Sequence, residues 1–236
     1  MENKRLDTAR VFERVFAIYR LQAAVLLPAA VILYLIPAAV SLSSDLTVQA
    51  LSLAASIIAV VFYQGVVVQA VRDIQDGVRD LSIGGLFRSV SKVLAPLLWT
   101  AILVGLGVFA GFIFFIIPGL LLLTWWAVAA PVVVVEVRSA TEALGRSRTL
   151  VSGHGWQVFG VLVVTLLLVF IGRLLFLTLA TAISDSDVSL VIGSLISGTL
   201  TAPVFALASA VLYLELLQLK GEQLPPADRA AFTDPS

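Results

Sequence analysis

The chain has no cysteine, a single histidine and few charged residues, and each shortage excludes a class of chemistry. Without cysteine it forms no disulfides and no thiolate metal sites. With His154 as its lone imidazole, neither a paired-histidine metal site nor a Ser-His-Asp triad has support beyond that residue. No intramembrane carboxylate pair or His/Glu cluster is visible in the sequence either. We therefore expect no catalytic residues, no bound metal and no cofactor, and predict that the protein is not an enzyme.

Charged residues make up 13% of the 236 residues, whereas hydrophobic residues make up 60%. This composition is far too apolar for a soluble domain of that length. Apolar runs of about 20 residues recur, which in lipid indicates helices, because each helix satisfies its own backbone hydrogen bonds. The short alternating segments of a membrane β-barrel do not appear. The net charge is zero and gives no argument for nucleic acid as a partner. The sequence predicts an all-α integral membrane protein.

Six stretches are predicted to span the membrane as three hairpins: residues 21–42, 46–71, 93–117, 120–135, 156–183 and 188–217. Pro118-Gly119 is the whole predicted connection between the third and fourth spans, so those helices are expected to be antiparallel neighbours. Gly107 and Gly111 form a GxxxG step that permits close approach of another helix. The tail, residues 218–236, is polar and rich in proline, and we expect it to be disordered and cytoplasmic.

The first predicted span has a competing interpretation as a secretory signal peptide, because Ala39-Val40-Ser41 resembles a cleavage site. The preceding charged region, residues 1–20, is long and contains acids, and the apolar core is about twice the usual length. We therefore expect the segment to be retained as a span.

Each predicted hairpin is preceded by a short amphipathic segment, at residues 6–20, 82–92 and 139–152. In the last of these, Ser139 and Glu142 have the spacing of a capping box, and Glu142 precedes Arg146 by the four residues that favour a helical ion pair. Such helices lie on a membrane surface. The sequence thus suggests three copies of one plan, a surface helix followed by a hairpin.

The positions of the lysines and arginines predict the orientation of the chain. All fifteen except Arg173 fall in the N-terminal segment, the second and fourth connections, or the tail, which lie on one side of the predicted membrane. The positive-inside rule makes that side the cytoplasm, so both termini are predicted to be cytoplasmic.

Four motifs stand out in the second half of the chain: Pro118-Gly119, Pro131-Val-Val-Val-Val-Glu136, Ala143-Leu144-x-Arg146-Ser147-x-x-Leu150-Val151-x-Gly153-x-x-Trp156, and Leu212-Tyr213-Leu214-Glu215 continued by Lys220-Gly221-Glu222. Together they resemble the membrane domain of glycerophosphoryl diester phosphodiesterases and related stand-alone bacterial membrane proteins of unknown function. The likeness covers roughly residues 11–224. Relatives usually carry arginines after the closing acid, whereas this chain has Leu217, Gln218 and Leu219. The resemblance implies a protein of the bacterial cytoplasmic membrane that has the membrane module and not the enzyme, and it leaves open only a separately encoded phosphodiesterase as a partner.

Two groups of residues are candidates for function. The candidate interaction residues are Glu136, Arg146, Arg148 and Glu215, at the cytoplasmic ends of spans and on the third surface helix. For Glu136 we favour a structural role, in which Arg138, Arg146 or Arg148 binds the carboxylate and fixes the surface helix against the spans. The candidate intramembrane polar path comprises Arg173, Gln49, Ser52, Ser56 and Gln64.

Arg173 lies about 25 Å along the fifth span, close to the outer interface. Its simpler interpretation is a side chain that snorkels to the outer head groups, and the alternative is a buried ligand site. The preferred function is accordingly a non-catalytic scaffold or accessory subunit that organises membrane lipids or another membrane or cytoplasmic protein through its surface helices. The alternative is a small transporter or lipid-handling protein that uses the polar path.

Overall fold

The computed structural model describes residues 6–40, 45–77, 82–183 and 186–225, and within these ranges the chain is helical and contains no strand. The helices are α1 (Thr8–Val40), α2 (Leu46–Gln75), α3 (Ile83–Lys92), α4 (Leu94–Phe114), α5 (Ile116–Trp125), α6 (Ala129–Glu136), α7 (Ala140–Val151), α8 (Gly155–Ile183) and α9 (Asp187–Leu219). The all-α prediction is confirmed.

Six stretches of the described chain are long and apolar enough to cross a membrane, as predicted: Thr8–Val40, Leu46–Gln75, Leu94–Phe114, Ile116–Glu136, Gly155–Ile183 and Val188–Leu219. The fourth is not one helix, because it combines α5 and α6 with a turn between them at residues 126–128. These features are those of a multi-pass membrane protein.

Prolines explain where the observed helices differ from the predicted spans. Pro96, Pro118 and Pro131 are each the third residue of a helix, in α4, α5 and α6. The first backbone N–H groups of a helix have no partner within it, so proline is tolerated in the first turn, whereas its ring would clash with a carbonyl one turn earlier in a continuing helix. Pro118 therefore lies inside α5, and the connection after α4 is Phe115 alone, in extended conformation. Pro131 likewise ends the continuous span that the sequence predicted.

The first amphipathic segment also differs from its prediction. Residues 8–20 are not a separate surface helix but the first part of α1, a single helix of 33 residues, while residues 1–5 lie outside the described chain. Of the three predicted amphipathic segments, only the second and third form separate short helices, α3 and α7. The plan of three equal copies is therefore not seen in the helix boundaries.

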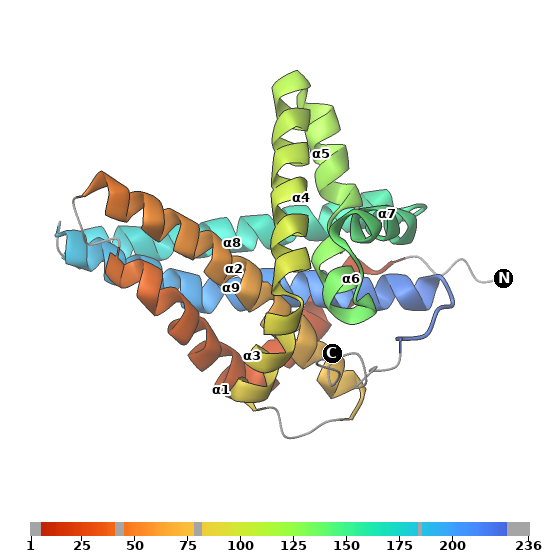
Figure 1. Cartoon of the computed structure of the whole chain (residues 1–236), viewed down its shortest axis with the longest axis horizontal. Coiled ribbons are helices and arrows are strands. Elements are labelled where there is room, and N and C mark those ends of the chain that lie inside the picture. The colour runs from red at the N-terminus through yellow and green to blue at the C-terminus, as the bar shows by residue number, and fades with distance from the viewer. Residues whose placement is uncertain (1–5, 41–44, 78–81, 184–185, 226–236) are drawn as a thin grey trace.

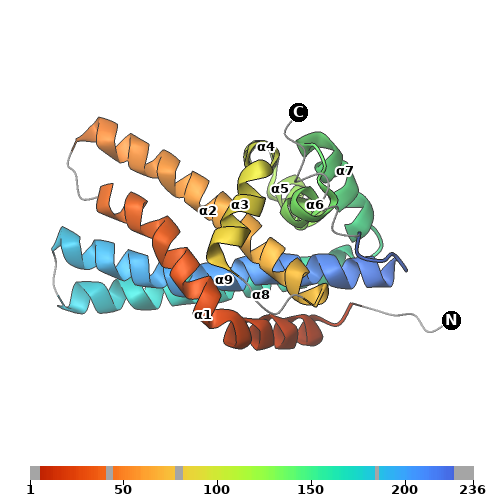
Figure 2. The ribbon, with the colours of Figure 1, turned by 60° about the horizontal axis from the view of Figure 1, so that its bottom comes forward.

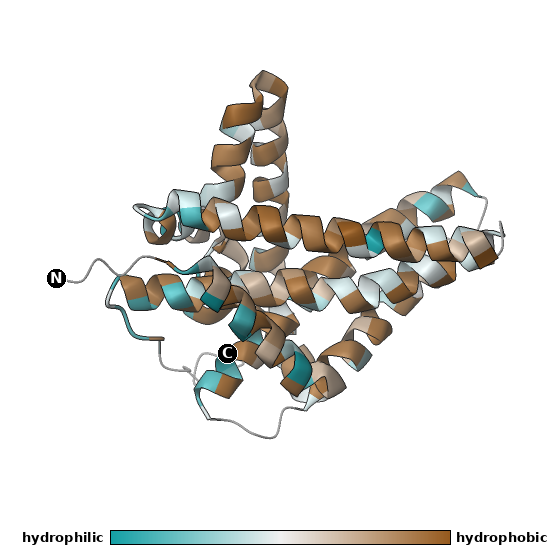
Figure 3. Cartoon of the chain, turned by 180° about the vertical axis from the view of Figure 1, so that it is seen from behind, coloured by the Kyte–Doolittle hydropathy of each residue, from teal (hydrophilic) through white to brown (hydrophobic). Residues whose placement is uncertain are grey.

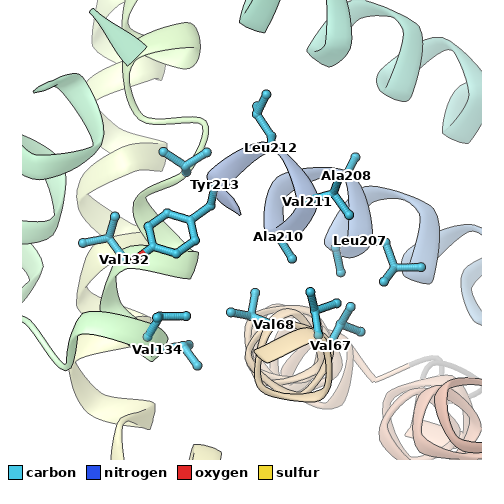
Figure 4. Packing of buried hydrophobic residues seen from close by; sticks show 14 of the residues in the cluster. Val67, Val68, Val132, Val134, Leu207, Ala208, Ala210, Val211, Leu212 and Tyr213 are labelled. Atoms are coloured by element: carbon cyan, nitrogen blue, oxygen red, sulfur yellow. The ribbon is translucent and has the colours of Figure 1, made fainter. Parts of the chain in front are cut away.

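Helix α9 lies at the centre of the molecule and packs against α1, α2, α6, α7 and α8. The last turns of α1 and α8 and the first turns of α2 and α9 gather at one end, and α7, the start of α8 and the end of α9 lie at the other (Figures 1 and 2). Part of the core lies where α2, α6 and α9 meet, with Val67 and Val68 on the side of α2 that faces α9 (Figure 4). This junction brings three distant parts of the sequence together.

Helices α4 and α5 pack against each other and project from the rest of the molecule, running across α8 and α9 (Figure 1). Their packing uses the predicted GxxxG step, because a Cβ at Gly111 would lie 2.9 Å from the Gly119 backbone, and one at Gly107 would lie 2.4 Å from the Trp126 ring. Both helices are apolar nearly throughout, whereas hydrophilic residues gather around α7 and the end of α9 (Figure 3).

Candidate functional site

The carboxylate of Glu136, the last residue of α6, is the centre of a network that we call the charged cluster: Glu136, Arg138, Arg146, Tyr213 and Glu222. The Glu136 side chain is only 6% exposed. It accepts hydrogen bonds from Arg138 Nε at 2.7 Å, from Arg146 Nε at 3.1 Å and from the Tyr213 hydroxyl at 3.0 Å. Tyr213 points from α9 toward α6 (Figure 4). The contacts fix α6, α7 and α9 to one another.

Arg146 bridges two carboxylates, because its guanidinium also pairs with Glu222, beyond the end of α9. The hydrogen bonds that Arg146 donates to Glu222 and Glu136 raise the pKa of Arg146, and the bond that Glu222 accepts from Arg146 lowers the pKa of Glu222. Each charge in this part of the cluster therefore has a partner of opposite sign. Sequence reasoning placed Arg146 beside Glu136 but did not find Tyr213 or Glu222, which lie far away in the sequence.

The side chain of Arg72, near the end of α2, connects that helix to α6 and to the segment after α9. Its side chain is 2% exposed, and it donates to the carbonyl oxygen of Val135 at 3.1 Å and to that of Pro225 at 3.3 Å. The sequence marked Arg72 only as one of the basic residues that set orientation. A buried arginine bound to two carbonyl groups instead joins α2, α6 and the segment after α9.

Helix α7 is fixed at its start and along its buried face. The predicted capping box is present: the Ser139 N–H donates to the Glu142 carboxylate at 3.2 Å, and hydrogen bonding to Ser139 lowers the pKa of Glu142. The Ser147 hydroxyl donates to the Trp125 carbonyl at 2.8 Å. The Arg148 guanidinium lies 4.4 Å from the centre of the Trp125 ring. α7 is thereby held against the C-terminal end of α5.

One predicted pairing turns out differently. Arg146 is directed to Glu136 and Glu222 and not to Glu142, because the two carboxylates offer more contacts than one neighbour on an exposed helix face. Glu215, for which the sequence indicated no specific partner, pairs with Arg14 of α1. The periodicity of a single helix cannot show which distant helix lies opposite these side chains.

Val137, which follows Glu136, is in the left-handed conformation with φ of 49°. Glycine usually occupies this position after a helix, and a β-branched residue is strained there. The side chains on either side, Glu136 and Arg138, are bonded to each other, so the charged cluster holds the backbone in this conformation.

A second polar region lies between α1, α2, α8 and α9. Two adjoining hollows, of about 260 and 330 Å³, share the lining residues Tyr34, Val60, Val169, Arg173, Gly198 and Thr201. We call them together the four-helix cavity. Gln64 lines one hollow, and Ser52 and Ser56 line the other. Four of the five predicted path residues therefore converge on one cavity, and Gln49 is not among its lining residues.

The hydrogen-bond donors of the cavity fall into two kinds. Several hydroxyls are engaged with their own helices: Ser56 donates to the Ser52 carbonyl at 2.8 Å, and Thr201 donates to the Ser197 carbonyl at 2.7 Å. By contrast, the Tyr34 hydroxyl and the Arg173 guanidinium have no hydrogen-bond partner among the residues that the structure describes. No acidic side chain of the described chain lines either hollow. The cavity therefore offers free donors and an uncompensated positive charge.

Sequence reasoning missed the α9 wall and Tyr34. Ser194, Ser197 and Thr201 line the cavity at helical spacing on one face of α9, so the same search for polar stripes applied to the sixth predicted span would have found them. Tyr34 is an isolated polar group on α1, and no local pattern distinguishes it from a packed aromatic residue.

Comparison of the chain with protein-family models, with curated proteins and with solved structures gave no match. The resemblance to the membrane domain of glycerophosphoryl diester phosphodiesterases stays a prediction that rests on the motifs in the sequence.

Proposed function

We propose that the protein binds an anionic group, carried by a membrane lipid or a small solute, in the four-helix cavity, and that it handles or transports that ligand within the membrane. The observation that carries the proposal is the unpartnered pair of donors, Tyr34 and Arg173, in a cavity that no carboxylate lines. A cation among membrane-spanning helices is expensive, with estimates from a few kcal/mol upward, and therefore favours a functional role.

The chemistry of the lining supports an anion with apolar parts nearby. A guanidinium and a phenol both donate hydrogen bonds, so the complementary ligand presents acceptor oxygens, and charge-assisted bonds to phosphate or carboxylate are the strong ones. The remaining walls include Val60, Val169 and Phe205, which suit a hydrocarbon chain. A phospholipid and a small organic anion share these features.

Arg173 is also exposed, which agrees with the simpler role of a side chain that snorkels toward head groups. The two roles differ in what the arginine must do. Snorkelling requires only a long cationic side chain, and Arg173→Lys would preserve it. Ligand binding requires donors at the cavity, so Arg173→Ala would remove bound ligand while the protein still inserts and folds.

The test is native mass spectrometry of the protein gently released from its membrane, for the wild type and for Arg173→Ala. We expect an anionic lipid or solute bound to the wild type, and at least tenfold less in the variant, because a lost charged hydrogen bond is worth about 1.5–3 kcal/mol. The matched control is Arg20→Ala, which removes an exposed arginine of α1 that lines neither hollow. Equal retention in all three proteins would contradict the proposal.

Transport is tested separately in proteoliposomes that contain the ligand identified by mass spectrometry. Flux that requires Arg173 would indicate translocation, whereas binding without flux would indicate a lipid-handling role. Both results keep the cavity as the site and differ only in whether the ligand crosses the bilayer.

The scaffold hypothesis has less geometric support. Three of its four candidate residues, Glu136, Arg146 and Glu215, form ion pairs within the chain, and Arg148 lies over Trp125. A scaffold would therefore have to bind its partner through other surfaces. A stoichiometric protein found in the same mass spectra would favour the scaffold.

The proposed orientation follows the charges. The end of the molecule that holds α7 and the end of α9 carries Arg138, Arg146, Arg148 and Lys220 and would face the cytoplasm of a bacterial cell, together with both termini. There α7 would lie at the interface. The opposite end carries the polar helix caps Asp45 and Ser186 and would face outward.

A further inference from the structure

We infer that the α4–α5 hairpin does not cross the membrane: it enters the lipid of one leaflet and turns back there, with its tip among acyl chains. The inference rests on the protein being embedded in a bilayer, and not on the cavity binding a ligand. Four observations support it, namely the chemistry of the tip, the length of α5, the anchoring of its base and the direction of the hairpin.

The tip contains no polar or charged side chain. Its sequence is Phe114-Phe115-Ile116-Ile117-Pro118, and the first four side chains are 69–75% exposed on the protein. The two other turns predicted on the outer side read Ser41-Leu-Ser-Ser-Asp45 and Ser184-Asp-Ser-Asp187. Two turns thus have the composition of loops in water, whereas the turn between α4 and α5 does not. No Asp, Glu, Lys or Arg occurs anywhere from Val93 to Val135.

Helix α5 is too short to span. Its ten residues extend about 15 Å, which is half of the roughly 30 Å hydrocarbon thickness. It ends at Trp125, and the following helix does not prolong it toward the membrane surface: α6 is enclosed by protein, with Val132 and Val133 fully buried. The arm that returns from the tip is therefore α5 alone.

The base of the hairpin lies level with α7. The Trp125 carbonyl accepts the hydrogen bond from Ser147, and Arg148 lies over its ring. Arg146, Arg148 and Thr149 occupy the polar side of α7, so this helix marks the level of the interface. The tip lies about 15 Å from this base along the hairpin, and because the hairpin runs across α8 and α9, which are long enough to span, that length does not carry the tip through the bilayer (Figure 1).

The lipid of one leaflet is the occupant that these features fit. A protein partner would leave the other exposed sides of α4 uncovered, since Trp99, Leu106, Phe109 and Ile113 are each more than 60% exposed. Acyl chains cover all sides of a hairpin without any specific contact. The chain would then cross the membrane four times, through α1, α2, α8 and α9.

Single-cysteine labelling tests this directly, because the native chain has no cysteine. Ile116→Cys and Phe115→Cys would each be expressed in intact cells and treated with a membrane-impermeant maleimide. Ser186→Cys, at the start of α9, is the control for the outer side, and Thr141→Cys, on the exposed face of α7, is the control for the cytoplasmic side.

We expect both tip cysteines to react at least ten times more slowly than Ser186→Cys in intact cells, and more slowly than Thr141→Cys in opened vesicles, until detergent removes the lipid. Labelling of the tip from outside at the rate of Ser186→Cys would show a hairpin that crosses, and would overturn the inference. Labelling from the cytoplasmic side at the rate of Thr141→Cys would overturn it too. Neither result bears on ligand retention by Arg173, so the two proposals fail separately.

Discussion

The charged cluster and the four-helix cavity both place polar groups among apolar helices. In the cluster these groups have hydrogen-bond partners within the described chain, whereas in the cavity two donors have none there. In the charged cluster, Glu136 is bonded by three donors and Arg146 by two acceptors. In the cavity, Arg173 and Tyr34 line the walls without a partner in the described chain. A network that is internally satisfied contributes to the fold, whereas donors left unsatisfied beside a hollow point to a ligand. Changes in the first region should therefore affect stability, and changes in the second should affect binding.

The largest expected effect is that of Glu136→Ala. It leaves the Arg146 guanidinium and the Tyr213 hydroxyl without their common acceptor in a nearly buried site, and removing one partner of a buried ion pair costs about 3–5 kcal/mol. Because Arg146 keeps Glu222, we expect a loss near the low end, about 3 kcal/mol. Unfolding in mixed micelles measures it. Glu13→Ala, at an exposed position of α1, is the control and should change the free energy of unfolding by less than about 0.5 kcal/mol. A similar small change for Glu136→Ala would show that the cluster is not structural.

Removing single hydroxyls tests the comparison with matched substitutions. Tyr213→Phe loses a hydrogen bond to a carboxylate and should lower the free energy of unfolding by about 1.5–3 kcal/mol, without changing ligand retention. Tyr34→Phe should have the reverse pattern, with stability unchanged and retained ligand reduced several-fold. Tyr19→Phe serves as a control on the same helix as Tyr34, because Tyr19 lines neither hollow and its hydroxyl donates to the Leu200 carbonyl at 3.2 Å, so its loss should reduce stability only. If Tyr213→Phe lost as much ligand as Tyr34→Phe, the charged cluster and the four-helix cavity would not differ in their roles.

Val137→Gly measures the backbone strain of Val137, whose left-handed conformation is maintained by the charged cluster. Relief of a left-handed non-glycine residue is worth about 1–2 kcal/mol, and the greater freedom of glycine in the unfolded chain offsets about 0.4–1 kcal/mol of that. The net expectation is a protein more stable by about 0.5 kcal/mol. Val164→Gly, on an exposed face within α8, should instead be destabilising, because glycine is a poor helix former. A Val137→Gly variant less stable than the wild type would show that the valine side chain contributes packing that outweighs the strain.

The smallest effect concerns pH. Arg146 lowers the pKa of Glu222 below its ordinary value, so the folded state favours the ionised carboxylate. This contribution is present above the unfolded pKa of about 4.3 and is lost as pH falls through the lower folded value. Glu222 is 41% exposed, so solvent screening limits the contribution to about 0.5 kcal/mol. Acid titration of stability should therefore be slightly shallower in Glu222→Gln than in the wild type, and an identical titration would show that the pair is not coupled to folding.

Local sequence patterns predicted the elements of the fold well and their junctions less well. Apolar run length found the long helices, and the capping box correctly located the start of α7. The turn after α5 was missed although Pro131 signals it, because an uninterrupted apolar run outweighed the proline in the prediction. The first amphipathic segment was assigned to a separate helix because its charges change abruptly at Leu21, whereas the backbone of α1 continues through that change.

The two polar regions differ in how far the sequence could reveal them. Glu136 and Arg146 are ten residues apart, and their pairing followed from a short connection between two helices. Tyr213 and Glu222 are more than seventy residues from their partners, so only the tertiary packing of α9 brings them there. The cavity was partly predictable, because Ser52 and Ser56 share a helix face, but the convergence of four helices on Arg173 depends on how those helices pack.

The contacts of the segment after α9 also bear on how the protein is made. A ribosome delivers the chain from its N-terminus, so Glu136 and Arg146 leave it well before Tyr213 and Glu222, and Arg72 leaves it before Pro225. Until those residues arrive, Glu136 lacks the Tyr213 hydroxyl, Arg146 lacks the second of its two carboxylates and Arg72 lacks the Pro225 carbonyl. The bundle is therefore closed by residues synthesised after all of the other helices, and a nascent chain halted within α9 would present these incompletely bonded groups to the insertion and quality-control machinery of the membrane.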